Sequence, residues 1–260
     1  MSYIKRALIT GSTSGIGLAI ARQLAAEGVD IVLHGLSSED EGQVLVQAFL
    51  DEFSVGVSYF QADISDPNQI TDLFDRVKKE VGFISILVNN AGIQHTSPIE
   101  TFPVEQWDKI IAVNLSSAFH TTQQVLPFMV EQGWGRIINI ASVHGLVASV
   151  NKAAYCAAKH GLIGLTKVTA LELAAKQVTV NAICPGWTDT PLLVQQFKAF
   201  SQKNNTSYEE AKQGLIKEKA PYPDFVAPDD IGRLVVFLCS DAAKAITGTS
   251  LPIDGGWTAH

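Results

Sequence analysis

Three residue types with the spacing of a proton-transfer site occur between positions 142 and 159. Tyr155 and Lys159 stand four residues apart, and Ser142 precedes Tyr155 by thirteen residues. On a helix, residues i and i+4 share one face with Cβ atoms about 5–6 Å apart, so the ammonium is predicted to lower the tyrosine pKa. Tyr155 is therefore predicted to act as general base or acid, with Ser142 binding the reacting oxygen.

A glycine turn, Thr10-Gly11-Ser12-Thr13-Ser14-Gly15-Ile16-Gly17, lies near the N-terminus. Its spacing is G-x-x-x-G-x-G rather than the commoner G-x-G-x-x-G, but it follows an expected strand and opens an expected helix. Backbone N–H groups at such a helix end bind phosphate. The turn predicts a dinucleotide site, and the alternative is a plain link between strand and helix.

The end of the second expected strand, His34-Gly35-Leu36-Ser37-Ser38, bears on which dinucleotide binds. A 2′-phosphate would require a basic side chain there or in the glycine turn. Neither segment has one, so the sequence favours NAD over NADP. An acidic side chain that would hold the ribose hydroxyls of NAD is also missing from this strand end.

Two further strand ends carry polar or small residues. Asp63 follows the third strand and could accept a hydrogen bond from an adenine amino group, although helix capping is an alternative. Asn89-Asn90-Ala91-Gly92 ends the fourth strand, at the edge where ligands of open α/β sheets bind. Close approach of a cofactor is one interpretation of this segment, and a plain turn is the other.

Asn114 lies on the apolar stripe of an expected helix, where an unpaired amide is costly. We expect its amide to bind backbone or water, which could open a proton path from Lys159 to solvent. Taken singly, Asn114, Ser142, Tyr155 and Lys159 each have an ordinary structural explanation. Their joint occurrence with the glycine turn favours a catalytic group.

Short β-branched runs alternate with helical stretches, which predicts an α/β fold with crossover connections and a parallel sheet. The runs are apolar throughout, so helices should cover both faces. The seven expected strands span 7–10, 31–34, 57–61, 86–89, 136–141, 178–183 and 249–253.

The segment 191–226 departs from this alternation because it is polar and charged, with Asn204-Asn205 between two helical stretches. It is predicted to form a helical lid inserted between the last two strands. The whole chain, 1–260, is otherwise expected to form one domain, since its length suits an undivided α/β unit.

Composition excludes some partners. A net charge of -7 and a pI near 5.3 offer no basic surface for nucleic acid or anionic membranes. The three cysteines lie among apolar residues and suit a reducing compartment. Met1 leads directly into an apolar strand, so no signal peptide is expected, and a cytoplasmic location is predicted, with no metal site.

With these motifs the chain resembles the short-chain dehydrogenase/reductase family over nearly its full length. The resemblance implies a Rossmann-like, doubly wound sheet of seven strands in the order 3-2-1-4-5-6-7, and a homotetramer. It also implies cofactor contacts beyond the glycine turn, at Leu36, Asp63, Ile64, Asn90, Ala91, Gly92, Tyr155, Lys159, Pro185, Gly186, Trp187 and Thr190.

Four donors near Tyr155 suggest a subsite for a small anion: Gln94, His144, Lys152 and Gln196. Lys152 would supply the charge, while Trp187 and Trp257 would enclose the apolar part of a short molecule. The alternatives are a solvated loop lysine, a histidine that packs structurally and tryptophans of the core or of a subunit contact.

Segments 93–96, 142–152 and 254–258 resemble the members of the family that oxidise (R)-3-hydroxybutyrate. The resemblance implies NAD-dependent oxidation of (R)-3-hydroxybutyrate, a small hydroxy-carboxylate, to acetoacetate, with the four donors around the carboxylate. A 3-oxoacyl-thioester reductase is the alternative within the family. A non-catalytic dinucleotide-binding regulator is the alternative of another class.

Overall fold

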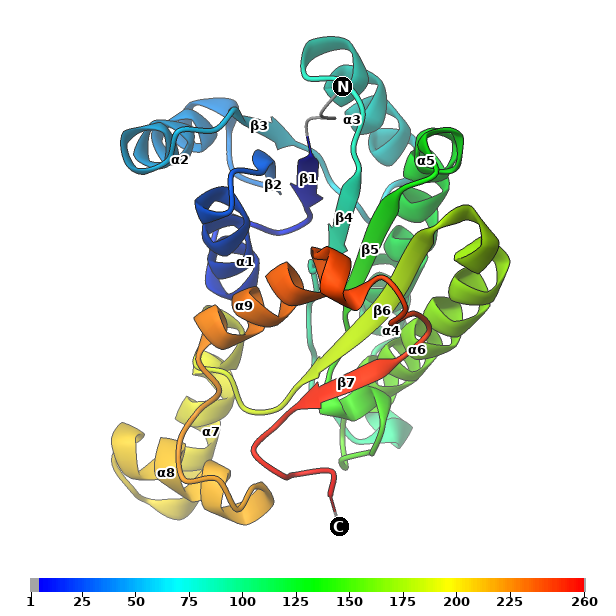
Figure 1. The fold of residues 1–260 in the computed structure, drawn as a ribbon. Helices are drawn as coiled ribbons and strands as arrows, with labels where there is room; N and C mark the ends of the chain where they lie inside the picture. The colour runs from blue at the N-terminus through cyan, green and yellow to red at the C-terminus, as the bar shows by residue number, and fades with distance from the viewer. Residues whose placement is uncertain (1–4, 260) are drawn as a thin grey trace.

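The computed structural model describes residues 5–259, apart from the side chains at 192, 195, 196, 199 and 203. Seven strands form one parallel sheet in the order β3-β2-β1-β4-β5-β6-β7, which confirms the expected topology (Figure 1). Every expected strand is present, with its ends within two residues of prediction. The strands are β1 (Arg6–Ile9), β2 (Asp30–Gly35), β3 (Val57–Gln61), β4 (Ile86–Asn89), β5 (Gly135–Ile140), β6 (Val178–Pro185) and β7 (Ser250–Ile253).

Helices cover both faces of this sheet (Figure 1). One face carries α1 (Gly15–Ala26), α2 (Glu39–Glu52) and α9 (Pro228–Cys239). The other carries α3 (Pro67–Glu80), α4 (Val104–Ile111), α5 (Ser117–Gln132) and α6 (Ala153–Leu173).

Alternate residues of each central strand enter different cores. Ile9 and Val88 pack in the cluster under α1 and α9, whereas Leu8 and Leu87 pack in the cluster under α3 and α5. All four side chains are fully buried. Because neighbouring strand residues point to opposite faces, uninterrupted apolar runs are required here, as the sequence indicated.

Local sequence signals fix the helix ends. The Asp66 side chain caps α3 by accepting from the Asn68 N–H, with Pro67 in the first turn, as predicted. Helix α2 begins with a capping box formed by Ser38 and Glu41.

The strand order reverses between β1 and β4, and this point positions the site. The Thr10 hydroxyl, just after β1, accepts from the Asn90 and Ala91 N–H groups at 3.0 and 3.1 Å. The Asn90 amide donates in return to the Thr10 and Gly11 carbonyls at 2.9 and 3.0 Å. The two strand ends are therefore linked directly beneath the crevice between them.

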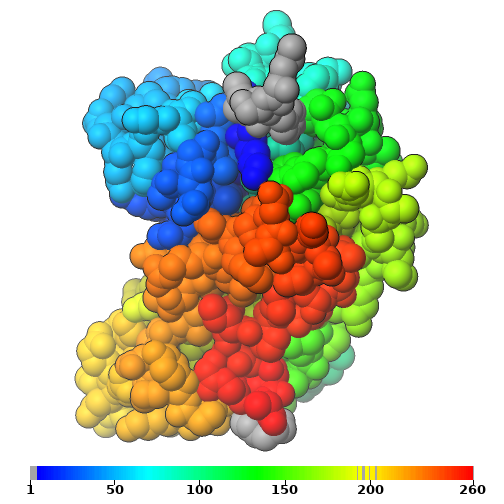
Figure 2. All heavy atoms as spheres, viewed as in Figure 1, coloured from blue at the N-terminus to red at the C-terminus, as the bar shows by residue number. Residues whose placement is uncertain are grey.

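The inserted segment is helical, as expected, with η5 (Pro191–Leu193), α7 (Val194–Asn204) and α8 (Tyr208–Lys219). Asn205 separates α7 from α8 in a left-handed conformation, with φ 49°. The helices lie beyond the carboxyl ends of the strands in Figure 1 and stand out from the body as yellow and orange atoms in Figure 2. Within residues 5–259, no helix is both long and apolar enough to cross a bilayer.

Candidate active site

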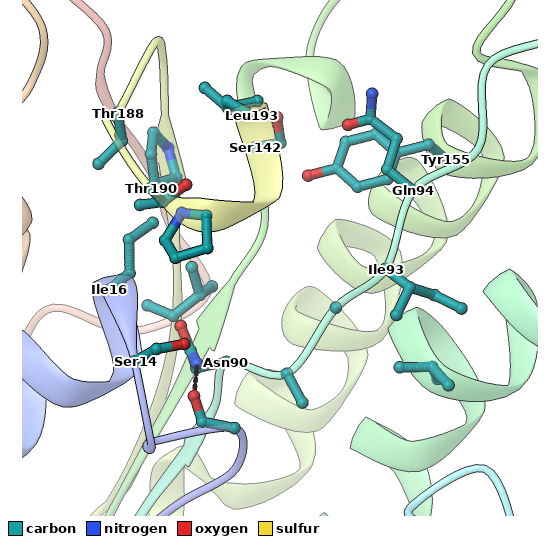
Figure 3. A pocket seen from close by; sticks show the side chains of 18 of the residues that line it. Ser14, Ile16, Asn90, Ile93, Gln94, Ser142, Tyr155, Thr188, Thr190 and Leu193 are labelled. Atoms are coloured by element: carbon teal, nitrogen blue, oxygen red, sulfur yellow. Dashed lines mark hydrogen bonds between the residues drawn. The ribbon is translucent and has the colours of Figure 1, made fainter. Parts of the chain in front are cut away.

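One cavity of about 490 Å³ connects the glycine turn with the predicted proton-transfer group. Its two ends are visible in Figure 3. Ser14, Ile16 and Asn90 lie at one end, and Tyr155, Ser142 and Gln94 lie at the other. The structure thus places a helix N-terminus of the kind that binds phosphate in the same cavity as the tyrosine predicted to transfer a proton.

The N-terminus of α1 opens into this cavity. Its N-cap residue, Ser14, forms no capping hydrogen bond through its side chain, and no acidic residue of the described chain lies in the first turn. Free N–H groups and a positive helix end therefore face the cavity, which suits a pyrophosphate. Gly11 and Gly15 have φ values of +63° and +55°, a conformation that glycine adopts without strain.

Gly17 has a different role from the rest of the turn. It does not line the cavity, and a Cβ there would lie 2.4 Å from both the Gly11 carbonyl oxygen and the Asn90 amide nitrogen. Gly17 lets α1 pack against the end of β1. The other predicted cofactor residues all line the cavity: Gly11, Thr13, Ser14, Gly15, Ile16, Leu36, Asp63, Ile64, Asn90, Ala91, Gly92, Tyr155, Lys159, Pro185, Gly186, Trp187 and Thr190.

Charge near Leu36 is negative rather than positive. Helix α2 begins with Glu39, Asp40 and Glu41, and the Arg76 guanidinium near this end is paired with Glu39 at 2.7 Å. A 2′-phosphate placed beyond Leu36 would therefore approach a helix end that carries three acidic side chains.

Tyr155 lies on the first turns of α6 and is only 8% exposed. Burial raises the pKa of its phenol to about 12, an effect that the Ser142 hydroxyl partly opposes. Burial therefore dominates this pKa in the protein alone, and the lowering expected from Lys159 together with a positive nicotinamide ring stays a prediction for the complex with cofactor.

Lys159, 3% exposed, lies on the same face of α6, with its Nζ 5.7 Å from the centre of the Tyr155 ring. Burial lowers the pKa of Lys159 to about 8. Burial therefore favours the neutral form of both the Tyr155 phenol and the Lys159 amine. A positive charge beside Tyr155 would favour its phenolate.

The Asn114 amide binds backbone, as the sequence predicted. It lies in a single π-helical turn, η2 (Ala112–Ser116), between α4 and α5. Its amide accepts from the Ile93 N–H and donates to the Ile93 carbonyl, each at 2.9 Å. It does not line the cavity, but an added Cβ at Gly92 would lie 3.6 Å from its oxygen and 3.8 Å from the Lys159 Nζ. Asn114 fixes the strand end beside Lys159.

Three of the four donors predicted for the anion subsite line the same cavity as Tyr155. Gln94, His144, Lys152, Trp187 and Trp257 line the cavity together with Ser142 and Tyr155. Gln196 belongs to α7, but its side chain lies outside the described part of the chain.

Lys152 is only 8% exposed, and its Nζ lies 5.6 Å from the centre of the Trp187 ring. Burial lowers the pKa of Lys152 to about 8. A cation in such surroundings favours a bound anion, since an anion offsets its loss of hydration. The interpretation of Lys152 as a solvated loop lysine is wrong.

His144 is held by hydroxyl groups on either side. Its Nε2 lies 3.0 Å from the Ser149 Oγ, and its Nδ1 lies 3.4 Å from the Ser142 Oγ. Burial, together with the charge of Lys152, lowers the pKa of His144 to about 3, so its ring is neutral at pH 7. It can donate a hydrogen bond but adds no charge.

Both tryptophans belong to the cluster that joins the strand ends to the inserted helices. The Trp187 and Trp257 rings lie 5.4 Å apart and pack with Phe197 and Ile216. They therefore wall the cavity and belong to the core at once. The Trp187 Nε1 is buried and has no hydrogen-bond partner within the described residues.

Sequence reasoning missed several residues of the site. His34 and Lys109 line the cavity. Hydrogen bonds from Ser65 lower the pKa of Asp63, and the charge of Lys109 adds to this effect. A histidine that closes an apolar strand at the carboxyl edge was a usable signal. Lys109 had none, since an exposed helical lysine is common.

Known proteins resemble this chain over nearly all of its length. Residues 11–258 match the family model described as enoyl-(acyl carrier protein) reductase. The chain is 52% identical to a D-beta-hydroxybutyrate dehydrogenase of Cupriavidus necator, with 98% of each covered. It is 49% identical to one of Rhizobium meliloti, over 98% of this chain and 99% of that protein.

A solved structure agrees with these matches. L-sorbose reductase from Gluconobacter frateurii, complexed with NADPH and L-sorbose, superposes with a TM-score of 0.94 at 30% identity, covering 99% of this chain and 97% of that one. The strand order, the glycine turn and the Ser142, Tyr155 and Lys159 group point the same way. The chain belongs to the short-chain dehydrogenase/reductase family.

Proposed function

We propose that this enzyme oxidises (R)-3-hydroxybutyrate to acetoacetate with NAD, reversibly. The observation that carries the substrate is Lys152, a buried cation in the same cavity as Tyr155. A short acid that carries a hydroxyl two carbons from its carboxylate would bridge these two groups. The relatives named D-beta-hydroxybutyrate dehydrogenase support the same substrate.

The residues present fit a nicotinamide dinucleotide, which the related L-sorbose reductase binds as NADPH. The uncapped end of α1 would hold the pyrophosphate, and Asp63 would face the adenine. Acidic residues at the start of α2 favour NAD over its phosphorylated form. When bound, NAD accepts the hydride that leaves C3 of the substrate.

The chain itself handles the proton. Tyr155 removes the proton of the C3 hydroxyl, and Ser142 donates to that oxygen and fixes its position. Lys159 stabilises the phenolate form of Tyr155, which accepts this proton and becomes the neutral phenol. Asn114 keeps the end of β4 in place next to Lys159, so that it acts as a positioning residue rather than by touching substrate.

The carboxylate would lie against Lys152, with Gln94, His144 and Gln196 as further donors, and the methyl group against Trp187 and Trp257. Closure of the segment 191–226 would then exclude water during hydride transfer. We further propose that the chain forms one domain, assembles as a homotetramer and works in the cytoplasm.

A 3-oxoacyl-thioester reductase is the second candidate. It would need an open channel for a pantetheine arm, and the buried Lys152 would face an uncharged thioester. A non-catalytic dinucleotide-binding regulator would not require Ser142, Tyr155 and Lys159 together.

The test is NADH formation from (R)- and (S)-3-hydroxybutyrate, with NAD and NADP in parallel. We expect turnover of the (R) acid with NAD, at least tenfold better than with NADP or the (S) acid. Turnover of an acetoacetyl thioester with no activity on the (R) acid would reject the proposal.

A further inference from the structure

His34 is the penultimate residue of β2, next to the glycine turn, and is 2% exposed. The Gly11 N–H donates to its Nδ1 at 3.1 Å. Its Nε2 lies 3.1 Å from the Ala62 carbonyl oxygen, just past β3. One imidazole therefore bridges the ends of three adjacent strands, β1, β2 and β3, on the cofactor side of the sheet.

The directions of these bonds determine the state of the ring. Since the Gly11 N–H can only donate, Nδ1 must be the unprotonated acceptor. The proton then lies on Nε2, which donates to the Ala62 carbonyl. Burial lowers the pKa of His34 to about 4, so this neutral tautomer is the form present at pH 7.

The main chain of His34 holds the same turn. The Ser12 N–H donates to the His34 carbonyl at 2.9 Å, and the His34 N–H donates to the Ser12 Oγ at 2.9 Å. Gly11 lies in the left-handed region, and its N–H is directed at the His34 ring. The orientation of the Gly11 peptide therefore depends on an acceptor at the Nδ1 position.

The other contact reaches the opposite part of the proposed cofactor site. Ala62 directly precedes Asp63, and the Ala62 N–H donates to the Gly35 carbonyl at 3.2 Å. Ala62 and Asp63 both line the cavity. His34 thus joins the turn that would hold pyrophosphate to the strand end that would face adenine.

We propose that His34 is a positioning residue for the dinucleotide, which sets the spacing between the pyrophosphate turn and the adenine end of the site through its neutral imidazole. The inference rests on the proposed cofactor but not on the proposed substrate. Of the two contacts, we expect the hydrogen bond from the Gly11 N–H to Nδ1 to contribute more to dinucleotide affinity.

Three substitutions separate the two contacts. His34→Asn keeps an acceptor close to the Nδ1 position and loses the reach to Ala62. His34→Gln extends toward the Nε2 position and loses the acceptor for Gly11. His34→Leu removes both at similar volume. His160→Leu is the matched control, because the exposed His160 ring bonds only to Cys156 of its own helix turn among the described contacts.

The main readout is the Kd of NADH, measured from its fluorescence without substrate. We expect His34→Leu and His34→Gln to raise this Kd by about tenfold, the factor that one lost hydrogen bond corresponds to. His34→Asn should stay within about threefold of the wild type, as should His160→Leu. In assays, the KM for NAD should follow the Kd, with kcat within about twofold.

An unchanged Kd in His34→Leu would overturn the proposal, and so would a His34→Asn protein as weak as His34→Leu. A fall of kcat together with a rise of both KM values would show general disruption and also overturn it. If His34→Leu does not fold, the comparison of His34→Asn with His34→Gln decides. Wild-type protein that binds NADH but leaves 3-hydroxybutyrate unchanged would reject the proposed substrate and leave this inference standing.

Discussion

The Lys159 Nζ lies 5.7 Å from the centre of the Tyr155 ring and donates to the Ile140 carbonyl oxygen at 2.7 Å. Ile140 ends β5, two residues before Ser142. The cation is thus anchored to the same strand end that carries the hydroxyl partner of the reaction. Lys159 can favour the Tyr155 phenolate from a fixed position.

Tyr155→Phe should lower kcat by about 10²–10⁴, the usual contribution of a general base. Only the phenolic oxygen is removed, so the Kd of NADH should stay within about threefold. Stopped-flow measurement of NADH formation, paired with NADH fluorescence titration, provides both values. A variant that keeps more than a tenth of wild-type kcat would mean that another group takes the proton.

Lys152→Met should raise the KM for 3-hydroxybutyrate by at least about tenfold and leave NADH binding unchanged, because a buried charge pair is lost. Lys109→Met is the matched control, since Lys109 lines the same cavity near Asp63. It should leave the KM for the acid unchanged. Steady-state kinetics with each substrate varied in turn would give the two KM values of each variant. An equal rise of both KM values in Lys152→Met would indicate that Lys152 is structural.

The affinity for substrate should fall at alkaline pH. Burial lowers the pKa of Lys152 to about 8, so its positive charge is present below pH 8 and is lost as the pH rises through 8. The KM for 3-hydroxybutyrate should therefore rise between pH 8 and 9.5. Lys152→Arg keeps its charge throughout this range, and its KM profile should be flat; a wild-type KM that is equally flat contradicts the assignment.

His34 should make the protein sensitive to acid. The pKa of His34 is lowered from 6.5 to about 4 in the fold, so the unfolded chain binds more protons between these pH values and stability falls as the pH falls. The cost of protonation approaches about 3 kcal/mol at pH 4. Urea unfolding at pH 7 and pH 4.5 should show a smaller loss for His34→Asn than for the wild type, and identical losses would contradict the prediction.

Gly17→Ala should destabilise the protein and weaken NADH binding by more than about tenfold, because the new Cβ would meet the Gly11 carbonyl at 2.4 Å. Gly164→Ala is its control within α6. Apart from the neighbouring backbone of α6 itself, no atom of the described residues lies within 4 Å of a Cβ at Gly164, and this residue is helical. That change should raise stability by about 0.5–1 kcal/mol. Thermal and urea unfolding would show whether the two substitutions change stability in opposite directions, and NADH titration would show whether only Gly17→Ala weakens binding.

Patterns that depend on local spacing could be read from the sequence. Apolar β-branched runs predicted every strand, since strands buried on both faces need them. Tyr155 and Lys159 shared a helix face, so their proximity followed from spacing alone.

Features that depend on surroundings could not be read in this way. The raised pKa of Tyr155 reflects burial by residues far away in sequence, and no local pattern reports it. The link between His34 and Gly11 spans 23 positions and needs the parallel pairing of β1 with β2. The buried state of Lys152 likewise depends on Trp187.

The ion pair of Lys212 with Asp189 joins α8 to a wall of the cavity. Their Nζ and Oδ2 atoms lie 2.6 Å apart, and Asp189 stands between Thr188 and Thr190, which both line the cavity. A lineage that reshaped α8 to admit a bulkier acid would shift that wall as well. A change in α8 that alters selectivity for the acid is therefore expected to alter the proposed contact of Thr190 with the coenzyme as well.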